Sequence, residues 1–101
     1  MTPDKCEVLV LERVSDDYEN LELISEPLTE KHNAIGLDEV KIVRILRKIA
    51  VAGWIDVFRY DVEKQEYVPA EFDGETPTDE LWFYISRIGI EVLKQSRRLT
   101  D

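Results

Sequence analysis

The sequence has few of the side chains from which disulfide frameworks, metal sites and catalytic centres are built. Its 101 residues include one cysteine and one histidine, Cys6 and His32. A single cysteine excludes a secreted scaffold held by internal disulfide bonds. A single histidine excludes a metal or catalytic site that needs a pair of them. The apolar runs are only a few residues long, which excludes a membrane-spanning helix.

Basic residues are scarce as well, because 13 Lys and Arg stand against 22 Asp and Glu, which gives a net charge of −9. This balance excludes a uniformly basic protein that coats nucleic acid. The charges are unevenly distributed. Residues 41–60 contain five bases and one acid, whereas residues 61–80 contain eight acids and one base. An acidic chain therefore carries one basic block the length of a helix, followed directly by a strongly acidic block.

The length and the hydrophobic content of 44% predict one domain over residues 1–101 with a single core. The first residues lack the basic, apolar and small-residue regions of a signal peptide, so we expect a cytoplasmic protein. The sequence contains no phosphate-binding loop, dinucleotide fingerprint or calcium-loop spacing. We therefore expect no enzyme, no cofactor and no metal. We interpret Cys6 as a small buried hydrophobe and His32 as a helix-end or loop residue.

The N-terminal residues predict a helix with a conventional start. We expect Thr2 to cap it, with Pro3 in the first position and Asp4 in the first turn. The helix should continue to about Val14 or Ser15. Its apolar residues fall on one face at helical spacing: Cys6, Leu9, Val10 and Val14.

A second helix is expected to begin between Leu21 and Pro27 and to end before Gly36, although residues 21–24 also suit a short strand. Proline is disfavoured inside a helix because it lacks the N–H and crowds the preceding turn. Pro27 is therefore expected in the first turn, with Ser25 as the cap. Gly36 suits a turn or a helix C-cap.

The third helix has the clearest pattern in the chain. Asp38 is a good N-cap, and Gly53 is expected to end the helix. Between them, apolar residues recur at helical spacing: Val40, Ile42, Val43, Ile45, Leu46, Ile49 and Ala50.

After Gly53 the pattern changes to β-branched and aromatic residues. Residues 54–60 and 81–85 are predicted strands that pair antiparallel. A short middle strand is expected at Tyr67–Val68 and Phe72, within a segment rich in acids and turns. Ser86 is expected to cap a final helix with Ile88, Val92 and Leu93 facing inward. The predicted fold class is α+β: three helices, an antiparallel β-hairpin and a C-terminal helix.

Two stretches resemble the winged helix-turn-helix family. Leu46, Ile49 and Gly53, followed by Trp54-Ile55, match the end of that family's recognition helix, Leu-x-x-Leu-x-x-x-Gly and an apolar pair, with isoleucine in place of the second leucine. Residues 85–93, Ile-Ser-Arg-Ile-Gly-Ile-Glu-Val-Leu, resemble the family's Leu-Thr-x-x-Gly-x-x-x-Leu motif, in which a wing strand enters the last helix. Ser86 replaces the threonine. Ile90 stands where an arginine or lysine is common.

The resemblance implies a small winged-helix protein that binds duplex DNA, a transcriptional regulator that forms a dimer. Its recognition helix would be the basic block. On a helix, Lys41, Arg44 and Lys48 lie within about 60° of one another, and Arg47 lies about 60° further round, so that they form one cationic stripe. The resemblance places this stripe in the major groove. Arg59 and Arg87 would add contacts near the wing.

The same residues also allow other interpretations. Apart from the resemblance, the stripe is more typical of a solvated face, in which Asp38 could pair with Lys41. The acidic wing would also be repelled by phosphates. Trp82 and Tyr84 fall on the sheet face opposite Leu81, Phe83 and Ile85. Either the hairpin tip or the last helix covers them, or they form an interface with a second copy or another protein. The alternative hypothesis is therefore an acidic winged-helix module that binds protein and not DNA.

Overall fold

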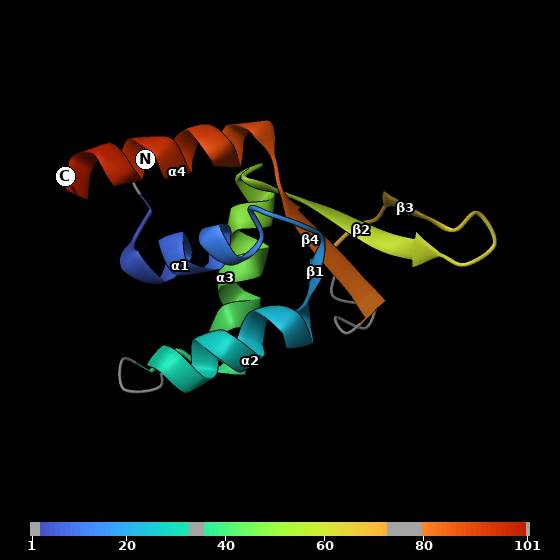
Figure 1. Cartoon of the computed structure of the whole chain (residues 1–101), viewed down its shortest axis with the longest axis horizontal. Helices are drawn as coiled ribbons and strands as arrows, with labels where there is room; N and C mark the ends of the chain where they lie inside the picture. Colours follow the sequence, from blue (N-terminus) through green and yellow to red (C-terminus); the bar gives the residue numbers. More distant parts are fainter. Residues whose placement is uncertain (1–2, 33–35, 73–79, 101) are drawn as a thin grey trace.

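The computed structural model describes residues 3–32, 36–72 and 80–100, and of residues 31, 32 and 98–100 the backbone alone. The described part is an α+β fold of four helices and one four-stranded antiparallel sheet (Figure 1). In chain order the elements are α1 (Lys5–Arg13), β1 (Glu19–Asn20), α2 (Leu21–His32), α3 (Glu39–Val51), β2 (Ile55–Asp61), β3 (Glu66–Pro69), β4 (Leu81–Ile85) and α4 (Arg87–Thr100).

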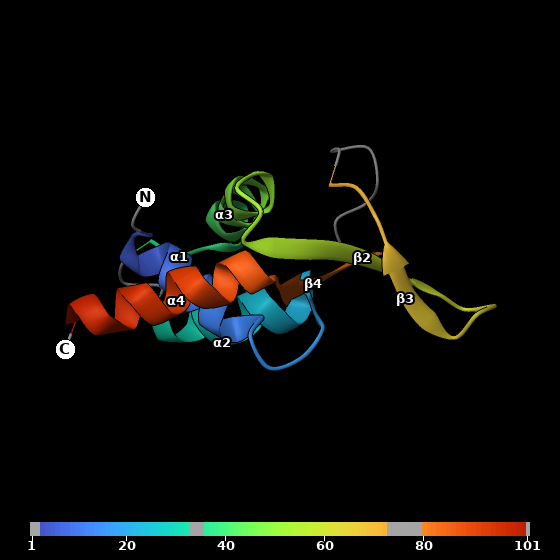
Figure 2. The ribbon, with the colours of Figure 1, turned by 90° about the horizontal axis from the view of Figure 1, so that it is seen from above.

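The helices gather at one end of the molecule, and the hairpin of β2 and β3 projects from the other, as both ribbon views show (Figures 1 and 2). The molecule is accordingly elongated, with extents of 45 × 28 × 21 Å. In the turn of the hairpin the Asp61 carboxylate accepts hydrogen bonds from the amides of Glu63 (3.0 Å) and Lys64 (3.2 Å). Such a side-chain bond to the next amides stabilises a tight turn. Within the described residues no helix is both long and apolar enough to cross a membrane.

The strands lie in the order β1-β4-β2-β3. β2 pairs with β4 from Ile55 opposite Ile85 to Arg59 opposite Leu81, which confirms the expected antiparallel pairing. β3 occupies the edge beside β2 and ends at Pro69. A proline suits an edge because it has no N–H to donate to a further strand.

Two features of the sheet differ from the prediction. Phe72 is not part of the short strand β3, which ends at Pro69. The last hydrogen bond of this segment to β2 runs from the Ala70 amide to the Val57 carbonyl (2.9 Å). The ring of Phe72 instead packs against Phe83, with 5.6 Å between ring centroids. In addition, β1 pairs with β4, with Glu19 opposite Phe83. Two residues are too few for a sequence period, so the sequence does not predict this strand.

The start of α1 also differs, because its N-cap is Asp4 and not Thr2. The Asp4 carboxylate accepts from the Glu7 amide (2.8 Å), and the Glu7 carboxylate accepts from the Asp4 amide (2.9 Å). This reciprocal pair is a capping box, which position 4 can form because a glutamate follows three residues later. Pro3 therefore precedes the cap, and Thr2 lies outside the described residues.

The helix α2 begins at Leu21, capped by the Asn20 side chain, which accepts from the Leu23 amide (2.9 Å). Residues 21–24 are thus helical. Pro27 lies inside the helix and not in its first turn, so the expected cap at Ser25 is wrong. Proline leaves the Leu23 carbonyl without its helical donor. The Arg13 Nε atom donates to that carbonyl (3.3 Å) and replaces the missing bond.

Both predicted ends of α3 are confirmed. The Asp38 carboxylate accepts from the Lys41 amide (2.8 Å), and Gly53 follows the helix with φ +81°. Gly36 precedes the helix with φ +78°, in the turn that its residue type predicts. Positive φ favours glycine, which has no Cβ to clash with the backbone.

Two hydrogen bonds from Ser86 attach the start of α4 to the residues that follow α3, and a third caps α4 itself. The Ser86 hydroxyl donates to the Gly53 carbonyl (2.5 Å) and accepts from the Gly89 amide (3.0 Å), which confirms it as the cap. Its own amide donates to the Trp54 carbonyl (2.9 Å). A Cβ at position 89 would overlap that Trp54 oxygen. The two stretches that resemble the winged-helix family are therefore bonded directly to each other.

One hydrophobic core joins the helices to the sheet. Most of its fully buried members come from α1, α2, α3 and β4, among them Val10, Ile24, Leu46, Ile49, Leu81 and Phe83. Two residues expected to face inward do not: Val40 is 68% exposed and Ile88 is 57% exposed. Val40 lies on the helix side that carries Arg44 and Arg47, and Ile88 lies over the turn at Gly53. Cys6 is half-buried against the core.

Candidate nucleic-acid interface

The two faces of α3 have opposite character. Ile42, Leu46 and Ile49 are fully buried and seat the helix on the core. The opposite face is exposed along its whole length and carries, in order, Val40, Arg44, Arg47, Lys48 and Val51. The two arginines occupy the middle of this face. Val51, at its end, is 90% exposed. The expected cationic residues are therefore accessible, and two valines border them.

The stripe does not form one continuous surface, however. Three of its members, Lys41, Arg44 and Lys48, line a groove of about 500 Å³ between α3 and the start of α1. Three acidic residues line the same groove: Asp4, Glu7 and Asp38. This groove consequently has no excess of positive charge. Arg44 belongs both to the groove and to the exposed face beside it, where Arg47 also lies.

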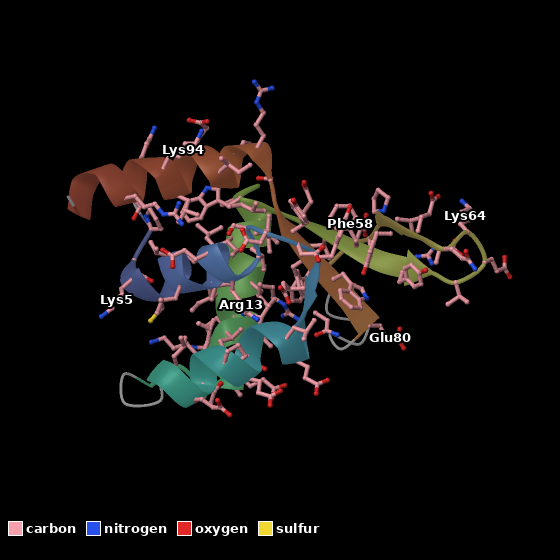
Figure 3. All side chains as sticks on the ribbon, in the orientation of Figure 1. Lys5, Arg13, Phe58, Lys64, Glu80 and Lys94 are labelled. Carbon is pink, nitrogen blue, oxygen red and sulfur yellow. The ribbon has the colours of Figure 1, made fainter. Side chains whose placement is uncertain are left out.

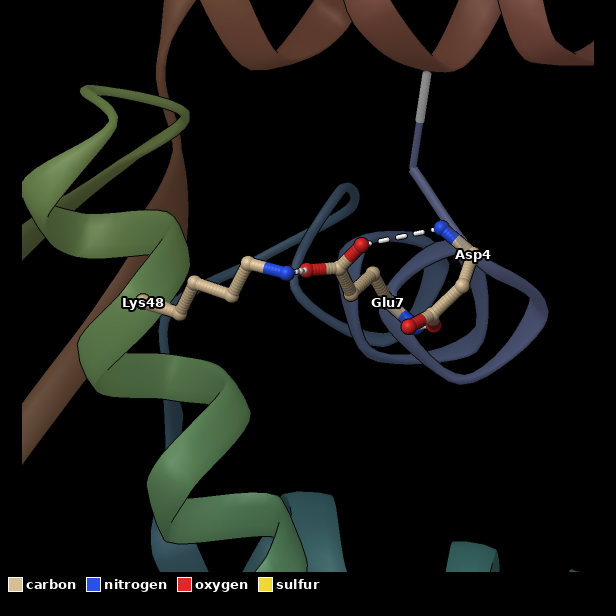
Figure 4. Close-up of polar contacts among 3 residues, drawn as sticks. All are labelled: Asp4, Glu7 and Lys48. Atoms are coloured by element: carbon tan, nitrogen blue, oxygen red, sulfur yellow. Dashed lines mark hydrogen bonds and ion pairs between the residues drawn. The ribbon is translucent and has the colours of Figure 1, made fainter. Parts of the chain in front are cut away.

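Lys48 is joined to Glu7 across this groove. Its Nζ atom lies 2.9 Å from Glu7 Oε2 (Figure 4). The Glu7 side chain is 4% exposed and the Lys48 side chain 62%. The hydrogen bond to Glu7, followed by the negative charge of Glu7, raises the pKa of the Lys48 ammonium above its usual value. Lys48 therefore stays protonated at neutral pH, but Glu7 already offsets its charge.

Glu7 is a residue that sequence reasoning missed. The spacing of Asp4 and Glu7 is the sequence signature of a capping box, and that signal was available. The second role of Glu7, holding Lys48, has no local signal, because the two residues belong to different helices. The carboxylate uses one oxygen for each role: Oε1 accepts from the Asp4 amide and Oε2 faces Lys48 (Figure 4).

Asp38 does not form the side-chain ion pair with Lys41 that their spacing allows. The oxygen of Asp38 accepts from the backbone amide of Lys41. This bond caps α3, where a carboxylate is also favoured by the positive end of the helix dipole. The pairing expected at this spacing therefore involves the amide, and the ammonium of Lys41 remains at the groove.

Arg47 faces the other side of α3. Its guanidinium carbon lies 5.2 Å from the centroid of the Phe72 ring, a cation–π contact. Arg47 and Phe72 also line a second groove, of about 570 Å³, between the end of α3 and the strands β2 and β3. The segment that follows β3 thus holds Arg47 from the side opposite to Glu7.

The two other expected contacts lie on separate elements. Arg59 is exposed on β2 opposite Leu81, and Arg87 is exposed as the first residue of α4. Among the described residues that line the two grooves beside α3, neither arginine occurs. Lys64 lies at the tip of the hairpin, far from α3 (Figure 3).

The outer face of the sheet carries a layer of six aromatic rings, which we call the aromatic layer: Tyr18, Phe58, Tyr60, Tyr67, Trp82 and Tyr84. Trp82 and Tyr84 are half-buried, and among the described residues the rings that contact them come from Tyr18 and Tyr67. Neither the hairpin tip nor α4 supplies those rings. Burial raises the pKa of the Tyr67 hydroxyl, and the nearby Asp17 carboxylate adds to this rise.

No family model, curated protein or solved structure matches the chain. His32 ends α2, and its side chain lies outside the described residues.

Proposed function

We propose that this chain is a winged helix-turn-helix domain that binds duplex DNA through α3, as a regulator of transcription would. The observation that supports this function is the accessible pair Arg44 and Arg47 at the middle of the exposed face of α3, whose other face is fully buried. A helix held in this way can enter the major groove without losing its packing. The arrangement of four helices and a small sheet with a projecting hairpin is compatible with the winged-helix resemblance.

In this proposal the cations have unequal roles. Arg44 and Arg47 point outward and can donate to phosphates or to the O6 and N7 atoms of guanine. Lys41 adds a phosphate contact from the groove. Lys48 contributes little, because its ammonium group is already paired with the Glu7 carboxylate. Arg59 and Arg87 lie outside the two grooves beside α3 and would contact only flanking backbone.

The hairpin limits the geometry of the complex. Glu63 and Glu66 stand near its tip, together with Asp61 in the turn. Carboxylates near phosphates are repelled, most strongly at low salt. The hairpin would therefore point away from the duplex, and α3 would carry almost all of the contact. A dimer would then be needed for two such helices to reach two half-sites.

A salt series with random-sequence duplex DNA tests the function. We expect binding whose logarithm falls linearly with the logarithm of salt concentration. Arg44→Ala with Arg47→Ala should weaken binding at least about tenfold and lower the salt slope by about two. Lys64→Ala with Lys94→Ala removes the same amount of charge, at the hairpin tip and on α4 (Figure 3). This variant should leave the affinity for DNA and the salt slope nearly unchanged. Absence of binding at low salt, or equal effects of the two double variants, would contradict the proposal.

A further inference from the structure

The aromatic layer lies on the face of the sheet opposite the buried Leu81, Phe83 and Ile85. Tyr18 stacks on Tyr67 with 3.9 Å between centroids, and it also meets Phe58 (5.1 Å) and Tyr84 (5.0 Å). Tyr67 further contacts Trp82 (5.3 Å) and Tyr60 (5.2 Å). The rings come from β2, β3, β4 and the segment before β1. They form one connected surface, which remains partly accessible: Tyr60 is 44% exposed.

The charge on this face has one sign. The register places Asp56 on the same face as Tyr84, directly opposite it across β2 and β4. Among the described strand residues that share the face, Asp56 is the one charged side chain. Asp17, also exposed, precedes Tyr18 and adds its negative charge beside Tyr67. The aromatic layer thus has one carboxylate beside Tyr84 and a second one beside Tyr67.

These charges decide what kind of occupant fits. Nucleic acid would bring phosphates against Asp17 and Asp56, which repel them. A second copy packed through the same face would add two more carboxylates, and the described strand residues of that face offer no cation to pair with them. A partner with cationic side chains meets neither obstacle. Of the two basic side chains, arginine is the better match, because its planar guanidinium stacks on aromatic rings and pairs with carboxylates in a fork.

We propose that the aromatic layer, with Asp17 and Asp56, binds a segment of a partner protein that presents arginine side chains. The guanidinium groups would lie over the exposed edges and faces of the tyrosine rings, and the two carboxylates would accept their N–H donors. The surface lies on the sheet and uses none of the cations of α3. It therefore holds whether or not α3 binds DNA.

Calorimetric titration of the full chain with a hexa-arginine peptide tests this inference. We expect binding that is at least about threefold tighter than that of hexa-lysine, because lysine does not stack in the same way. The rings of Tyr60 and Trp82 should shift in NMR spectra, whereas the ring of buried Trp54 should not. Tyr60→Ser, which removes the most exposed ring of the layer, should weaken binding of hexa-arginine and bring it close to that of hexa-lysine.

A matched pair of charge variants separates this surface from the general negative charge of the protein. Asp17→Asn with Asp56→Asn should weaken hexa-arginine binding at least about threefold. Asparagine can still accept the hydrogen bond that the Tyr18 amide donates to Asp17 (2.7 Å), so the loop should keep its shape. Glu63→Gln with Glu66→Gln removes two charges near the hairpin tip and should have less effect. Equal loss in both double variants, equal affinity for both peptides, or no binding would overturn the inference.

Discussion

Lys48 Nζ lies 2.9 Å from Glu7 Oε2, so the carboxylate that completes the capping box of α1 also holds a cation of α3. Glu7 is almost fully buried, whereas the lysine remains largely exposed. Leaving a buried carboxylate without its partner is costly, so Glu7 binds Lys48 in place rather than leaving it free for another anion. The contact connects helix stability with the charge that α3 offers to a ligand.

Replacing Glu7 by glutamine should separate these two roles. Glutamine can still accept the Asp4 amide in the capping box, but it no longer offsets the charge of Lys48. We expect tighter binding of random duplex DNA at low salt and a salt slope steeper by about one, measured by fluorescence anisotropy. Glu22→Gln removes one exposed acid of α2 that makes no ion pair within the described residues, and it is the control. A similar gain in both variants would show that net charge alone is responsible.

Two glycines should respond very differently to alanine. At Gly89 the new Cβ overlaps the Trp54 carbonyl oxygen, and backbone must move. We expect Gly89→Ala to lower the free energy of unfolding by about 3 kcal/mol or more. Gly36 has open space around it, so an alanine there would meet only the strain of its positive φ. Gly36→Ala should therefore lower the free energy of unfolding by about 1 kcal/mol. Urea denaturation of both variants checks this, and equal losses would contradict the close contact at Gly89.

The bond from Arg13 to the Leu23 carbonyl should matter only while Pro27 is present. Pro27→Ala restores the helical N–H that this carbonyl lacks. We therefore expect Arg13→Met to destabilise the wild-type chain by about 1 kcal/mol more than it destabilises the Pro27→Ala variant. A double-mutant cycle of unfolding free energies measures this coupling. Strict additivity would mean that Arg13 does not replace the missing helical bond.

Glu19 should make stability depend on pH. Burial beside Phe83 raises the pKa of its carboxyl above 4.5, although Arg13 acts against this rise. The folded chain then binds a proton more readily than the unfolded chain, so stability falls as pH rises through the interval between the two pKa values. Glu19→Gln should raise the melting temperature at about pH 7 and change it little at about pH 3. Glu26→Gln, on the exposed side of α2, should show no such difference.

Where a residue's role depends on its near neighbours, the sequence predicts the structure well. Asp38 and Gly53 mark the ends of α3 by cap chemistry, and a run of aromatic and aliphatic residues marks β4 at its observed limits. The exposed position of Arg44 and Arg47 follows from helical spacing alone. The errors at Thr2 and Pro27 arose where a second local signal competed: a better capping box at Asp4, and an arginine from another helix that supplies the missing donor.

The four helices, the β2–β4 pairing and the basic face of α3 can be predicted from the sequence, because periodicity and caps act within a few residues. The contact of Glu7 with Lys48, the contact of Phe72 with Arg47 and the gathering of six aromatic rings from four segments on one face appear only once the chain is folded. These contacts join residues far apart in the chain, and no period encodes them. The scarcity of basic residues therefore matters most on α3, where Glu7 pairs with Lys48 and the exposed Arg44 and Arg47 have no carboxylate partner among the described residues.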